Sequence, residues 1–357
     1  MSENKLDLLK CDRDLSIVDA MKMINKNTHG LVFVVDKNDT LLGCLADGNV
    51  RRWIINGGSL EVSVSDAMNP EPIYVKDKER NKATGLMSEY HIRSVAVVDD
   101  DKRLIDVVVA DPGLLPNKRV NTLSDIPVIV MAGGKGTRLY PYTKILPKPL
   151  VPIGDIPILE RILNRFAKYG VDEFYITVNY RKEMIKSYFA ESPHDFTVHF
   201  VEENKPLGTV GSIKLIKRDF NTPLFISNCD ILIEADYGDI MEHHIKFKND
   251  FTIVSALKNT VIPYGVLHTK KDGVVTSVVE KPELSHFVNT GMYIMNPEFI
   301  DWIPDEKVFH MTELVDLMIS KGKRVGMYPV NEYSFLDMGE MAELKKMEER
   351  INAEFNE

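Results

Sequence analysis

The residues whose types and spacing could do chemistry are concentrated between Val128 and Gly154. An apolar strand pattern at 128–131 is followed directly by three glycines and a lysine at 133–136, and Arg138 and Lys148 come soon after. Glycines at the end of a strand leave backbone N–H groups uncovered by side chains, which is how proteins hold phosphate. A guanidinium and an ammonium beside such a loop can clamp a triphosphate. The segment predicts a phosphate-binding loop that turns toward a helix.

Two well-known phosphate-binding motifs are excluded by the order of these residues. A P-loop requires a glycine, four residues, and then Gly-Lys followed by Ser or Thr, whereas Lys135 stands before its glycine. The dinucleotide-binding fingerprint requires a third glycine where this chain has Leu139. The loop therefore represents another class of phosphate site.

Two aspartates stand where metal ligands are expected. Asp230 follows the apolar run 224–229 and so ends a predicted strand, and Asp337 follows Phe335 and Leu336. Mg²⁺ prefers few carboxylates together with waters and substrate phosphates. Asp230 is therefore a candidate metal ligand, and Asp337 would supply the second carboxylate of an oxygen-rich site that suits Mg²⁺. The alternative for Asp337 is that it caps the final helix.

Composition limits the class of protein and its partners. The 357 residues are 44% hydrophobic and 27% charged, as in an ordinary globular protein that is long enough for two domains. A formal net charge of −9 argues against nucleic acid as a partner. The polar N-terminus has no apolar core of a secretory signal and no run long enough to span a membrane is present, so we expect a cytoplasmic protein. The widely spaced Cys11, Cys44 and Cys229 predict neither disulfides nor zinc.

The first part of the chain contains an internal repeat. The strand pattern at 32–36 recurs at 95–99, a shift of 63 residues, with a helical pattern before each copy and a turn and second apolar run after it. The predicted unit is helix, strand, turn, strand and helix, used twice, at about 8–58 and 65–118. We assign residues 1–120 to this α+β domain, 121–126 to a linker and 127–357 to a second domain.

In the second domain, strand patterns alternate with helical ones. Apolar spacing predicts helices at 158–169 and 184–189 and strands at 174–178, 197–201 and 224–229. Such alternation predicts a doubly wound, Rossmann-like α/β sheet that binds ligands at the carboxyl ends of its strands. A charged helix predicted at 340–357 has an apolar face, which indicates packing or a dimer contact, and we expect a homo-oligomer.

The motifs of the second domain resemble those of a known family. AGGKGTRL at 132–139 and LPKPLVPIG at 146–154 resemble the signature of the sugar-1-phosphate nucleotidylyltransferases, and the resemblance extends to the C-terminus. It implies catalytic roles for Arg138, Lys148, Asp230 and Asp337, with Mg²⁺ on the two aspartates. It also implies a nucleotide site made by the loop and by a PLGTVG segment, for which the alternative is a helix start capped by Thr209. The residues of that site are Ala132, Gly133, Gly134, Lys135, Gly136, Thr137, Gly208 and Gly211.

Three short segments further along the chain match the order of the family's sugar-binding motifs. Each segment alone is a weak signal, and their common order strengthens it. The resemblance implies that Glu280 accepts hydrogen bonds from sugar hydroxyls and that Lys281 binds the phosphate of the sugar. The predicted sugar-phosphate site consists of Tyr264, Gly265, Glu280, Lys281, Asn289, Thr290 and Gly291.

The repeat in the first domain resembles a pair of CBS domains, a module that usually binds adenosine nucleotides between its copies. Its ribose-contact signature, a small residue and an aspartate before a helix, is present at Ala46 and Asp47, although the family usually has Thr or Ser at the place of Ala46. In the second copy Ala110 replaces the aspartate. We predict one strong regulatory site for an adenine or guanine nucleotide, made by Asp47, Arg51 and Arg52. The alternative is a structural or dimerising module without a ligand.

The reaction that the resemblance implies joins a nucleoside triphosphate and a sugar 1-phosphate and releases pyrophosphate. A sugar phosphate is largely a dianion at neutral pH, so its attack requires no general base. A CBS pair ahead of this transferase is similar to the bacterial guanylyltransferases that use glucosamine 1-phosphate for legionaminic acid synthesis, which implies GTP and a hexosamine 1-phosphate. Glu202 or Glu203 would then accept hydrogen bonds from guanine. The alternatives are a uridylyl- or thymidylyltransferase, or a nucleotide sensor without catalysis.

Overall fold

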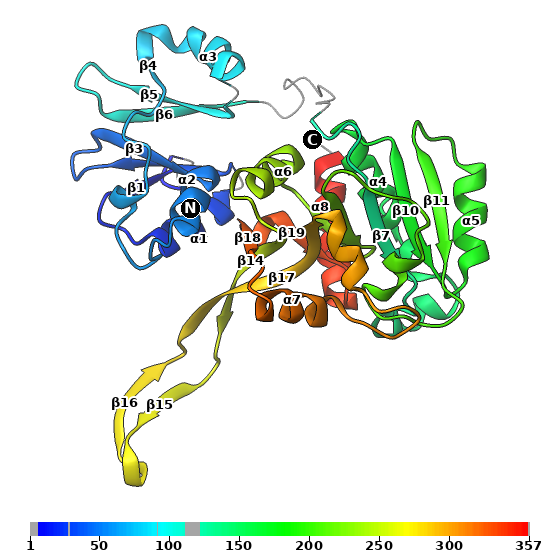
Figure 1. The fold of residues 1–357 in the computed structure, drawn as a ribbon. Helices are drawn as coiled ribbons and strands as arrows, with labels where there is room; N and C mark the ends of the chain where they lie inside the picture. The colour runs from blue at the N-terminus through cyan, green and yellow to red at the C-terminus, as the bar shows by residue number, and fades with distance from the viewer. Residues whose placement is uncertain (1–5, 28, 91, 111–121, 356–357) are drawn as a thin grey trace. The chain divides into compact units, whose positions relative to one another are not determined.

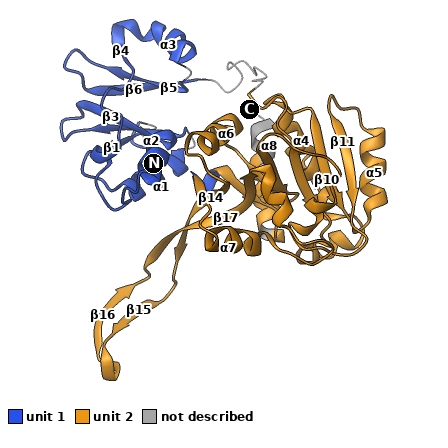
Figure 2. Ribbon diagram, in the orientation of Figure 1, with its two compact units in different colours: residues 1–117, 329–333 blue, residues 118–328, 334–357 orange. Residues whose placement is uncertain are grey.

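The computed structural model describes residues 6–27, 29–90, 92–110 and 122–355 and divides into two compact units (Figure 1; Figure 2). The first unit comprises residues 1–117 together with 329–333, and the second comprises residues 118–328 and 334–357. The short segment Pro329–Tyr333 therefore belongs to the first unit although both of its neighbours in sequence belong to the second. No helix of the described residues is both long and apolar enough to cross a membrane.

The first unit is built from two copies of one pattern. In the first copy, β1 (Lys10–Asp12) pairs in parallel with β2 (Leu31–Val35), which pairs antiparallel with β3 (Leu41–Ala46); α1 (Ile17–Asn27) and α2 (Asp47–Ile55) are its helices. In the second copy, β4 (Tyr74–Lys76), β5 (Ser94–Val98) and β6 (Leu104–Val109) repeat the sheet. The helical segments η2 (Asp77–Lys82) and α3 (Ala83–Tyr90) stand at the place of α1.

The register of the strands bears out the repeat that the sequence predicts. Leu31 pairs with Ala46 in the first copy, and Ser94 pairs with Val109 in the second, a shift of 63 residues for both partners. The two copies also share apolar packing, because Phe33 and Leu41 lie in one buried cluster with Ala96 and Leu104. The helix that the pattern predicts at the end of the second copy lies outside the described residues.

The second unit contains a mixed sheet of seven strands in the order β11-β10-β7-β12-β17-β14-β18. Its first four strands run parallel, and β17 runs antiparallel to both β12 and β14. The strands are β7 (Val128–Ala132), β10 (Glu173–Val178), β11 (Thr197–Glu202), β12 (Leu224–Asn228), β14 (Phe251–Val261), β17 (Glu283–Met295) and β18 (Val325–Val330).

Helical segments cover both faces of this sheet, because neighbouring residues of a strand point to opposite sides. On one face, Phe166 of α4 (Ile158–Ala167) packs 5.2 Å from the ring of Phe225 on β12 and 4.5 Å from that of Tyr237 on α6 (Tyr237–Lys246). On the other face, Ile226 of β12 shares a buried cluster with Leu314 of α7 (Met311–Ser320). The doubly wound α/β fold is therefore confirmed. The same cluster includes residues of η7 (Gly211–Leu215) and η9 (Pro297–Trp302).

The remaining elements complete the second unit. The helices α5 (Lys182–Glu191) and α8 (Met341–Phe355) lie where the sequence predicts helices, and Leu344 and Met347 of α8 are buried, which favours packing over a dimer contact for this part of the helix. A short antiparallel pair joins β13 (Ile231–Ile233) to β19 (Phe335–Asp337). Small pairs are formed by β8 (Pro152–Ile153) with β9 (Ile156–Pro157) and by β15 (Gly265–Thr269) with β16 (Val275–Glu280).

The glycine loop does not lead into an α-helix as the sequence analysis expects. After β7 the chain forms only η4 (Thr137–Leu139), one turn of 3₁₀-helix, and the first α-helix of this unit is α4. The helix dipole that would favour an anion at this loop is therefore much smaller than the sequence suggests. Backbone N–H groups and side-chain cations have to provide most of the attraction for phosphate.

Candidate active site

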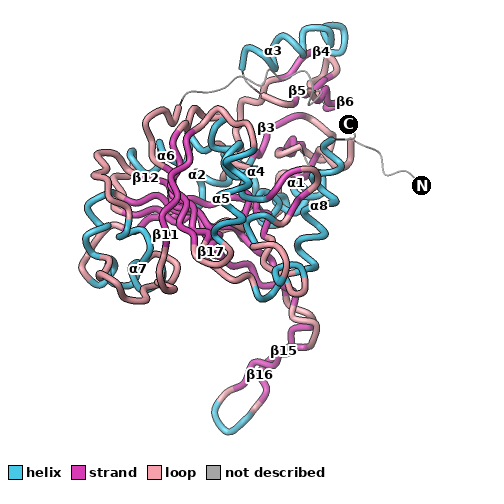
Figure 3. The backbone as a smooth tube through the Cα atoms, turned by 90° about the vertical axis from the view of Figure 1, so that its right-hand side faces the viewer, coloured by secondary structure: helices cyan, strands magenta, loops and turns pink. Residues whose placement is uncertain are grey.

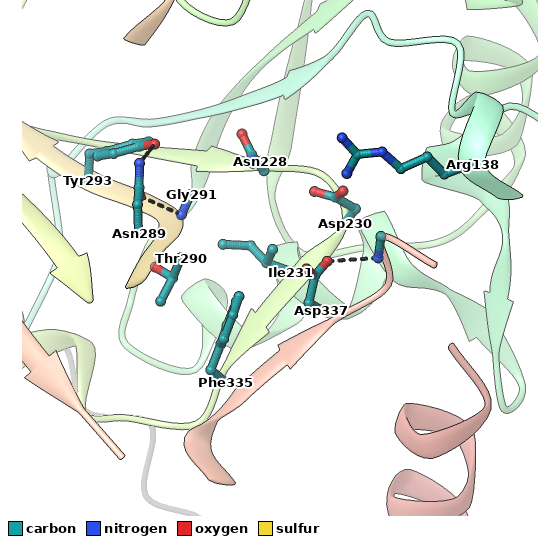
Figure 4. Close-up of a pocket in the computed structure, with 11 residues that line it drawn as sticks. Arg138, Asn228, Asp230, Ile231, Asn289, Thr290, Gly291, Tyr293, Phe335 and Asp337 are labelled. Atoms are coloured by element: carbon teal, nitrogen blue, oxygen red, sulfur yellow. Dashed lines mark hydrogen bonds between the residues drawn. The ribbon is translucent and has the colours of Figure 1, made fainter. Parts of the chain in front are cut away.

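A polar pocket of about 200 Å³ lies in the second unit, at the carboxyl end of β12 (Figure 4). It joins segments that are far apart in sequence, which the parallel order of β7 and β12 and the β13–β19 pair bring together. Six of the described residues that line it are predicted site residues, namely Arg138, Asp230, Asn289, Thr290, Gly291 and Asp337. The other five are Asn228, Ile231, Tyr293, Phe335 and Gly339.

The two aspartates face the same pocket because β13 and β19 pair with each other. Ile231, next to Asp230, is directly opposite Asp337, and the N–H of Met338 donates to the Asp230 carbonyl at 2.8 Å. Burial raises the pKa of the Asp337 carboxyl, and the nearby negative charge of Asp230 adds to the rise. The Asp337 carboxylate accepts the N–H of Gly339 at 2.7 Å, and since Gly339 precedes α8, this bond does not cap that helix.

The predicted cations lie on both sides of Asp230. The guanidinium of Arg138 points toward the two carboxylates in Figure 4, and the ammonium of Lys148 forms an ion pair with Asp230. Gly136 explains how Lys148 comes so close to the loop, because a Cβ on Gly136 would lie 2.9 Å from Cβ of Lys148. Gly136 also has φ +64°, a conformation that glycine adopts without strain. The loop and the LPKPL segment are thus packed against each other.

The rest of the glycine loop does not line the pocket. None of residues 132–137 is among the described residues around it, so the structure leaves their nucleotide-binding role a prediction. Gly133 instead packs against Glu203, because a Cβ there would lie 2.5 Å from Oε1 of that carboxylate. Burial raises the pKa of Glu203, whose Oε2 accepts the N–H of Leu207 at 3.2 Å. The neighbouring Glu202 is bound by two surface lysines, Lys182 and Lys186, and their hydrogen bonds lower its pKa to about 2.

Gly208 and Gly211 have a structural explanation that requires no ligand. A Cβ on Gly208 would lie 2.4 Å from the carbonyl oxygen of Phe309, and one on Gly211 would lie 3.0 Å from that of Lys307. Neither glycine lines the pocket among the described residues. The sequence pattern offers Thr209 as the cap of a helix that starts in its own segment. In the structure, the Thr209 hydroxyl instead accepts the N–H of Met311 at 2.8 Å and so caps α7.

The middle of β17 forms another wall of the pocket. Asn289 donates to the hydroxyl of Tyr293 at 2.8 Å and accepts the N–H of Gly291 at 2.9 Å (Figure 4). Thr290 is only 2% exposed, and its hydroxyl donates to the Val254 carbonyl at 2.7 Å. This side chain therefore shapes the wall more than it offers a binding group. Gly291 has φ +90°, and a Cβ there would lie 2.4 Å from the amide nitrogen of Asn228.

Four predicted sugar-phosphate residues lie elsewhere. Tyr264, Gly265, Glu280 and Lys281 belong to the ribbon around β15 and β16, which projects from the second unit in both Figure 1 and Figure 3. Tyr264 is 73% exposed, and none of the four lines the pocket among the described residues. The sugar-phosphate role of these four residues therefore stays a prediction. Order along the sequence does not determine where a long hairpin points.

Asn228, Ile231 and Gly339 line the pocket although no sequence motif predicts a role for them. Asn228 is the last residue of β12, close to Asp230, and ligands of α/β sheets bind at the carboxyl ends of strands. Its position at the end of a strand was therefore the available signal in the sequence. Ile231 and Gly339 carry no chemical motif. They reach the pocket only through the β13–β19 pairing, which sequence patterns do not reveal.

The predicted regulatory residues lie in α2 and at its start. Asp47 is the first residue of α2, and its carboxylate accepts a hydrogen bond of 2.7 Å from the side-chain amide of Asn331, which belongs to the same compact unit. Burial raises the pKa of Asp47, while this hydrogen bond and the charge of Arg51 act in the opposite direction. The guanidinium of Arg52 lies near Gly48, since a Cβ there would be 3.6 Å from it. The candidate ribose ligand is thus already engaged by the chain's own Asn331.

The donor set of the pocket fits a magnesium ion. Among the described residues, no group of three or more His, Cys, Asp or Glu side chains gathers as a closed metal site would require. The pocket offers two carboxylates, and Mg²⁺ typically takes its other ligands from water and from substrate phosphates.

Comparisons with known proteins agree with this architecture. Residues 127–354 match the family model described as "Nucleotidyl transferase", and residues 1–56 and 64–110 match the model of the CBS domain. The chain is 36% identical over 187 residues to the mannose-1-phosphate guanyltransferase of Debaryomyces hansenii, covering 49% of this chain and 51% of that protein. It is 34% identical over 187 residues to the mannose-1-phosphate guanyltransferase of Saccharomyces cerevisiae, with the same coverage. The chain therefore matches about half the length of these relatives.

Solved structures give a similar comparison. The crystal structure of HddC from Yersinia pseudotuberculosis is 27% identical and covers 63% of this chain and 99% of that chain, with a TM-score of 0.49. The family match itself spans well over half of the chain and contains Arg138, Lys148, Asp230 and Asp337. The chain belongs to the nucleotidyl transferase family and carries a pair of CBS domains ahead of its transferase domain.

Proposed function

We propose that this chain is a sugar-1-phosphate guanylyltransferase that converts GTP and a hexosamine 1-phosphate to a GDP-sugar and pyrophosphate. The observation that carries the proposal is the meeting of Arg138, Asp230 and Asp337 in one pocket, with Lys148 joined to Asp230. Cations and carboxylates at the carboxyl end of an α/β sheet suit phosphoryl chemistry, which depends on position and charge.

The mechanism follows from the charges of the substrates. An oxygen of the sugar phosphate, already a dianion, attacks the α-phosphorus of GTP and forms the new P–O bond. The bond from the α-phosphorus to the oxygen that bridges it to the β-phosphorus breaks, and pyrophosphate leaves with that oxygen. Arg138 stabilises the negative charge that grows on the departing group, and Lys148 keeps Asp230 oriented through their ion pair. When bound to Asp230 and Asp337, Mg²⁺ would offset phosphate charge.

Guanine is favoured over other bases by two observations. The relatives named above are guanyltransferases. Glu203 is buried, and its Oε2 accepts the N–H of Leu207, but its Oε1 lies beside Gly133 of the predicted nucleotide loop, where it can accept an N–H of guanine. Glu202 is an unsuitable partner, because its carboxylate is occupied by Lys182 and Lys186.

The sugar is assigned on weaker support than the base. The CBS pair ahead of the transferase favours glucosamine 1-phosphate through the resemblance to the enzymes of legionaminic acid synthesis. The relatives named above instead carry mannose 1-phosphate in their names. Uridylyl or thymidylyl transfer, and a nucleotide sensor without catalysis, remain the alternatives to guanylyl transfer.

We also propose that the CBS pair holds one regulatory nucleotide, with the ribose on Asp47 and phosphates near Arg51 and Arg52. Support comes from the position of Asp47 at the start of α2 and from Ala110 at the equivalent place of the second copy. The domain limits that go with this proposal are residues 1–120, 121–126 and 127–357. Leu123, within the proposed linker, is fully buried and donates its N–H to the Tyr169 carbonyl at 3.0 Å.

The proposal is tested by measuring pyrophosphate release from each of five nucleoside triphosphates with glucosamine, mannose and glucose 1-phosphates. We expect the highest kcat/KM with GTP and glucosamine 1-phosphate. Glu203→Gln should lower the preference for GTP over ATP, whereas Glu202→Gln serves as the matched control and should leave it unchanged. A preference for UTP or dTTP, or release of no pyrophosphate from any pair, would contradict the proposal.

A further inference from the structure

The ribbon that carries four of the predicted sugar-phosphate residues is exposed on both of its faces. We call residues 261–287 the arm; it includes β15, β16 and the adjoining ends of β14 and β17. None of these residues is buried, and only Ile262, Val266 and Pro282 are even partly covered. Figure 1 and Figure 3 show β15 and β16 pointing away from the sheet of their own unit. A two-stranded ribbon without other cover is at best marginally stable in water.

The arm is also unusually apolar for such an exposed segment. Of the 21 large apolar side chains that the described part of the chain exposes, nine lie in these 27 residues. Leu267 and Val278 are paired directly across the ribbon and are 57% and 60% exposed. Exposed apolar patches of this kind indicate a surface that another protein covers. The nine residues are Val261, Tyr264, Leu267, Val274, Val275, Val278, Val279, Leu284 and Phe287.

The junction between the arm and the sheet has the features of a hinge. The ladder of β14 and β17 ends at the pair Val261 and Glu283, and the next ladder begins at the pair Gly265 and Glu280. Pro263 and Pro282 lie in the gap between the ladders, and Lys281, directly before the second proline, has φ +46°. A residue other than glycine is strained in this conformation, and such strain is concentrated at functional segments.

The described side chains that line the pocket provide little positive charge beyond Arg138, although the charge of Lys258 also acts on Asp337. Among the described residues that line it, Arg138 is the single cationic side chain and it faces two carboxylates, while Lys148 is paired with Asp230. A sugar phosphate alone adds a charge of about −1.5 to −2 at neutral pH. Lys281 stands on the arm, exposed, and within the described residues it has no carboxylate at ion-pair distance. Within the part of the chain that the structure describes, the pocket therefore has little unpaired positive charge, and the same chain carries an unpaired lysine on its exposed arm.

We propose that the arm docks on a second copy of this chain and that the partner's Lys281 completes each active site by binding the sugar phosphate. β17 supports this occupant, because the same strand carries the arm at its start and Asn289–Gly291 of the pocket wall in its middle. In a twofold dimer, two chains can exchange equivalent elements. Each arm then occupies, on the partner chain, the position that it would otherwise occupy on its own chain. That position is beside the start of the arm and the pocket. The proposal rests on the proposed function for the identity of the phosphate.

Complementation between inactive copies tests this exchange. Asp230→Asn damages the pocket, and Lys281→Ala damages the arm. Each variant alone should have a small fraction of wild-type activity. A mixed dimer, obtained by co-expression with two different affinity tags and purified through both, contains one intact pocket that faces one intact arm. It should recover about half of the wild-type rate, because one of its two sites is complete.

The matched control for complementation is the mixed dimer of Asp230→Asn with Asp337→Asn, which should stay inactive because both changes damage pockets. If the arm acts on its own chain, the mixture of Asp230→Asn and Lys281→Ala also stays inactive, and the proposal is overturned. Full activity of Lys281→Ala alone would overturn it as well.

An activity-independent measurement separates this proposal from the proposed function. Val278 on the arm and Val308 on the body are both 60% exposed, so Val278→Asp and Val308→Asp make the same change at equal exposure. In sedimentation velocity, the wild-type chain and Val308→Asp should be dimers, and Val278→Asp should be a monomer with an unchanged melting temperature. A wild-type monomer, or a dimer that survives Val278→Asp, would overturn the exchange even for an enzyme with the proposed activity. A dimer that depends on Val278 but releases no pyrophosphate would instead contradict the proposed function.

Discussion

At the scale of single residues, the chemistry of the pocket depends on charge placed at the ends of strands. Asp230 follows β12, Asp337 ends β19, and Arg138, in the segment after β7, points toward both. These three positions could be predicted, because each follows a clear strand pattern or lies in a recognisable motif. Asn228 could not be singled out, since one amide at a strand end has no motif to distinguish it from a surface residue.

Arg138→Ala should lower kcat about 100-fold or more with a smaller change in KM. The reason is that its contact strengthens as charge grows on the departing pyrophosphate, and removal of one such donor typically costs that much. Arg138 is exposed, so the fold should be unaffected. Steady-state kinetics of pyrophosphate release measure both parameters, with Arg218→Ala as control because Arg218 pairs with Glu173 on another part of the surface. A change confined to KM would show that Arg138 contributes only to ground-state binding.

At the scale of elements, α2 holds a carboxylate in surroundings that do not favour its charged form. Burial raises the pKa of Asp47 above its ordinary value of 3.8. The folded state therefore favours the protonated carboxyl. The contribution of Asp47 to the stability of the folded protein is therefore complete below the pKa that this carboxyl has in the unfolded chain. It is lost as the pH rises through the higher pKa that the carboxyl has in the folded protein. A buried carboxylate with a raised pKa is typical of a functional site.

Asp47→Asn should raise the melting temperature of the full-length chain at pH 7 and have little effect near pH 4. The amide cannot ionise, but it retains an oxygen that accepts the bond from Asn331. If the penalty is about 1 kcal/mol, the gain at neutral pH is on the order of 2–4 °C. Calorimetric melting of both proteins from pH 4 to pH 8 measures the difference. A difference that does not vary with pH, or a lower melting temperature at pH 7, would contradict this account of Asp47.

Elements also show where sequence patterns stop being informative. The repeat, the parallel strands and the helices α4, α5 and α8 could be predicted, because their apolar spacing reflects one buried face. The helix expected after the glycine loop is a single 3₁₀ turn, and the arm leaves the apolar side chains of Val275, Val278 and Val279 exposed. In both cases the outcome depends on tertiary or quaternary contacts that no local pattern contains.

At the scale of the whole molecule, Pro329–Tyr333 connects the two functions through the chain itself. This segment belongs to the first compact unit and offers Asn331 to Asp47, while its continuation enters β19 and reaches Asp337 six residues later. A nucleotide that takes Asp47 for its ribose has to displace Asn331. The proposed binding at the CBS pair would thereby change the restraint on β19, the strand that ends at Asp337.

Asn331→Ala should increase the affinity of the CBS pair for its nucleotide, because the competitor for Asp47 is removed. Couplings of this kind are typically about 1–3 kcal/mol, so we expect a gain of at least about fivefold. Isothermal calorimetry of the full-length chain with adenine and guanine nucleotides measures it. The control is Asn38→Ala, which changes an exposed turn of the same unit. An affinity that Asn331→Ala leaves unchanged or weakens would exclude Asn331 as a competitor.

The central claim, guanylyl transfer to a sugar 1-phosphate, is tested most directly by following the phosphorus atoms of GTP. The wild-type chain is incubated with Mg²⁺, glucosamine 1-phosphate and GTP labelled either at the α-phosphate or at the γ-phosphate. The account predicts that the α-label appears in a GDP-sugar and the γ-label in pyrophosphate, and that Asp230→Asn abolishes both products. Release of the γ-label as free phosphate, or an α-label that never enters a sugar nucleotide, would contradict it.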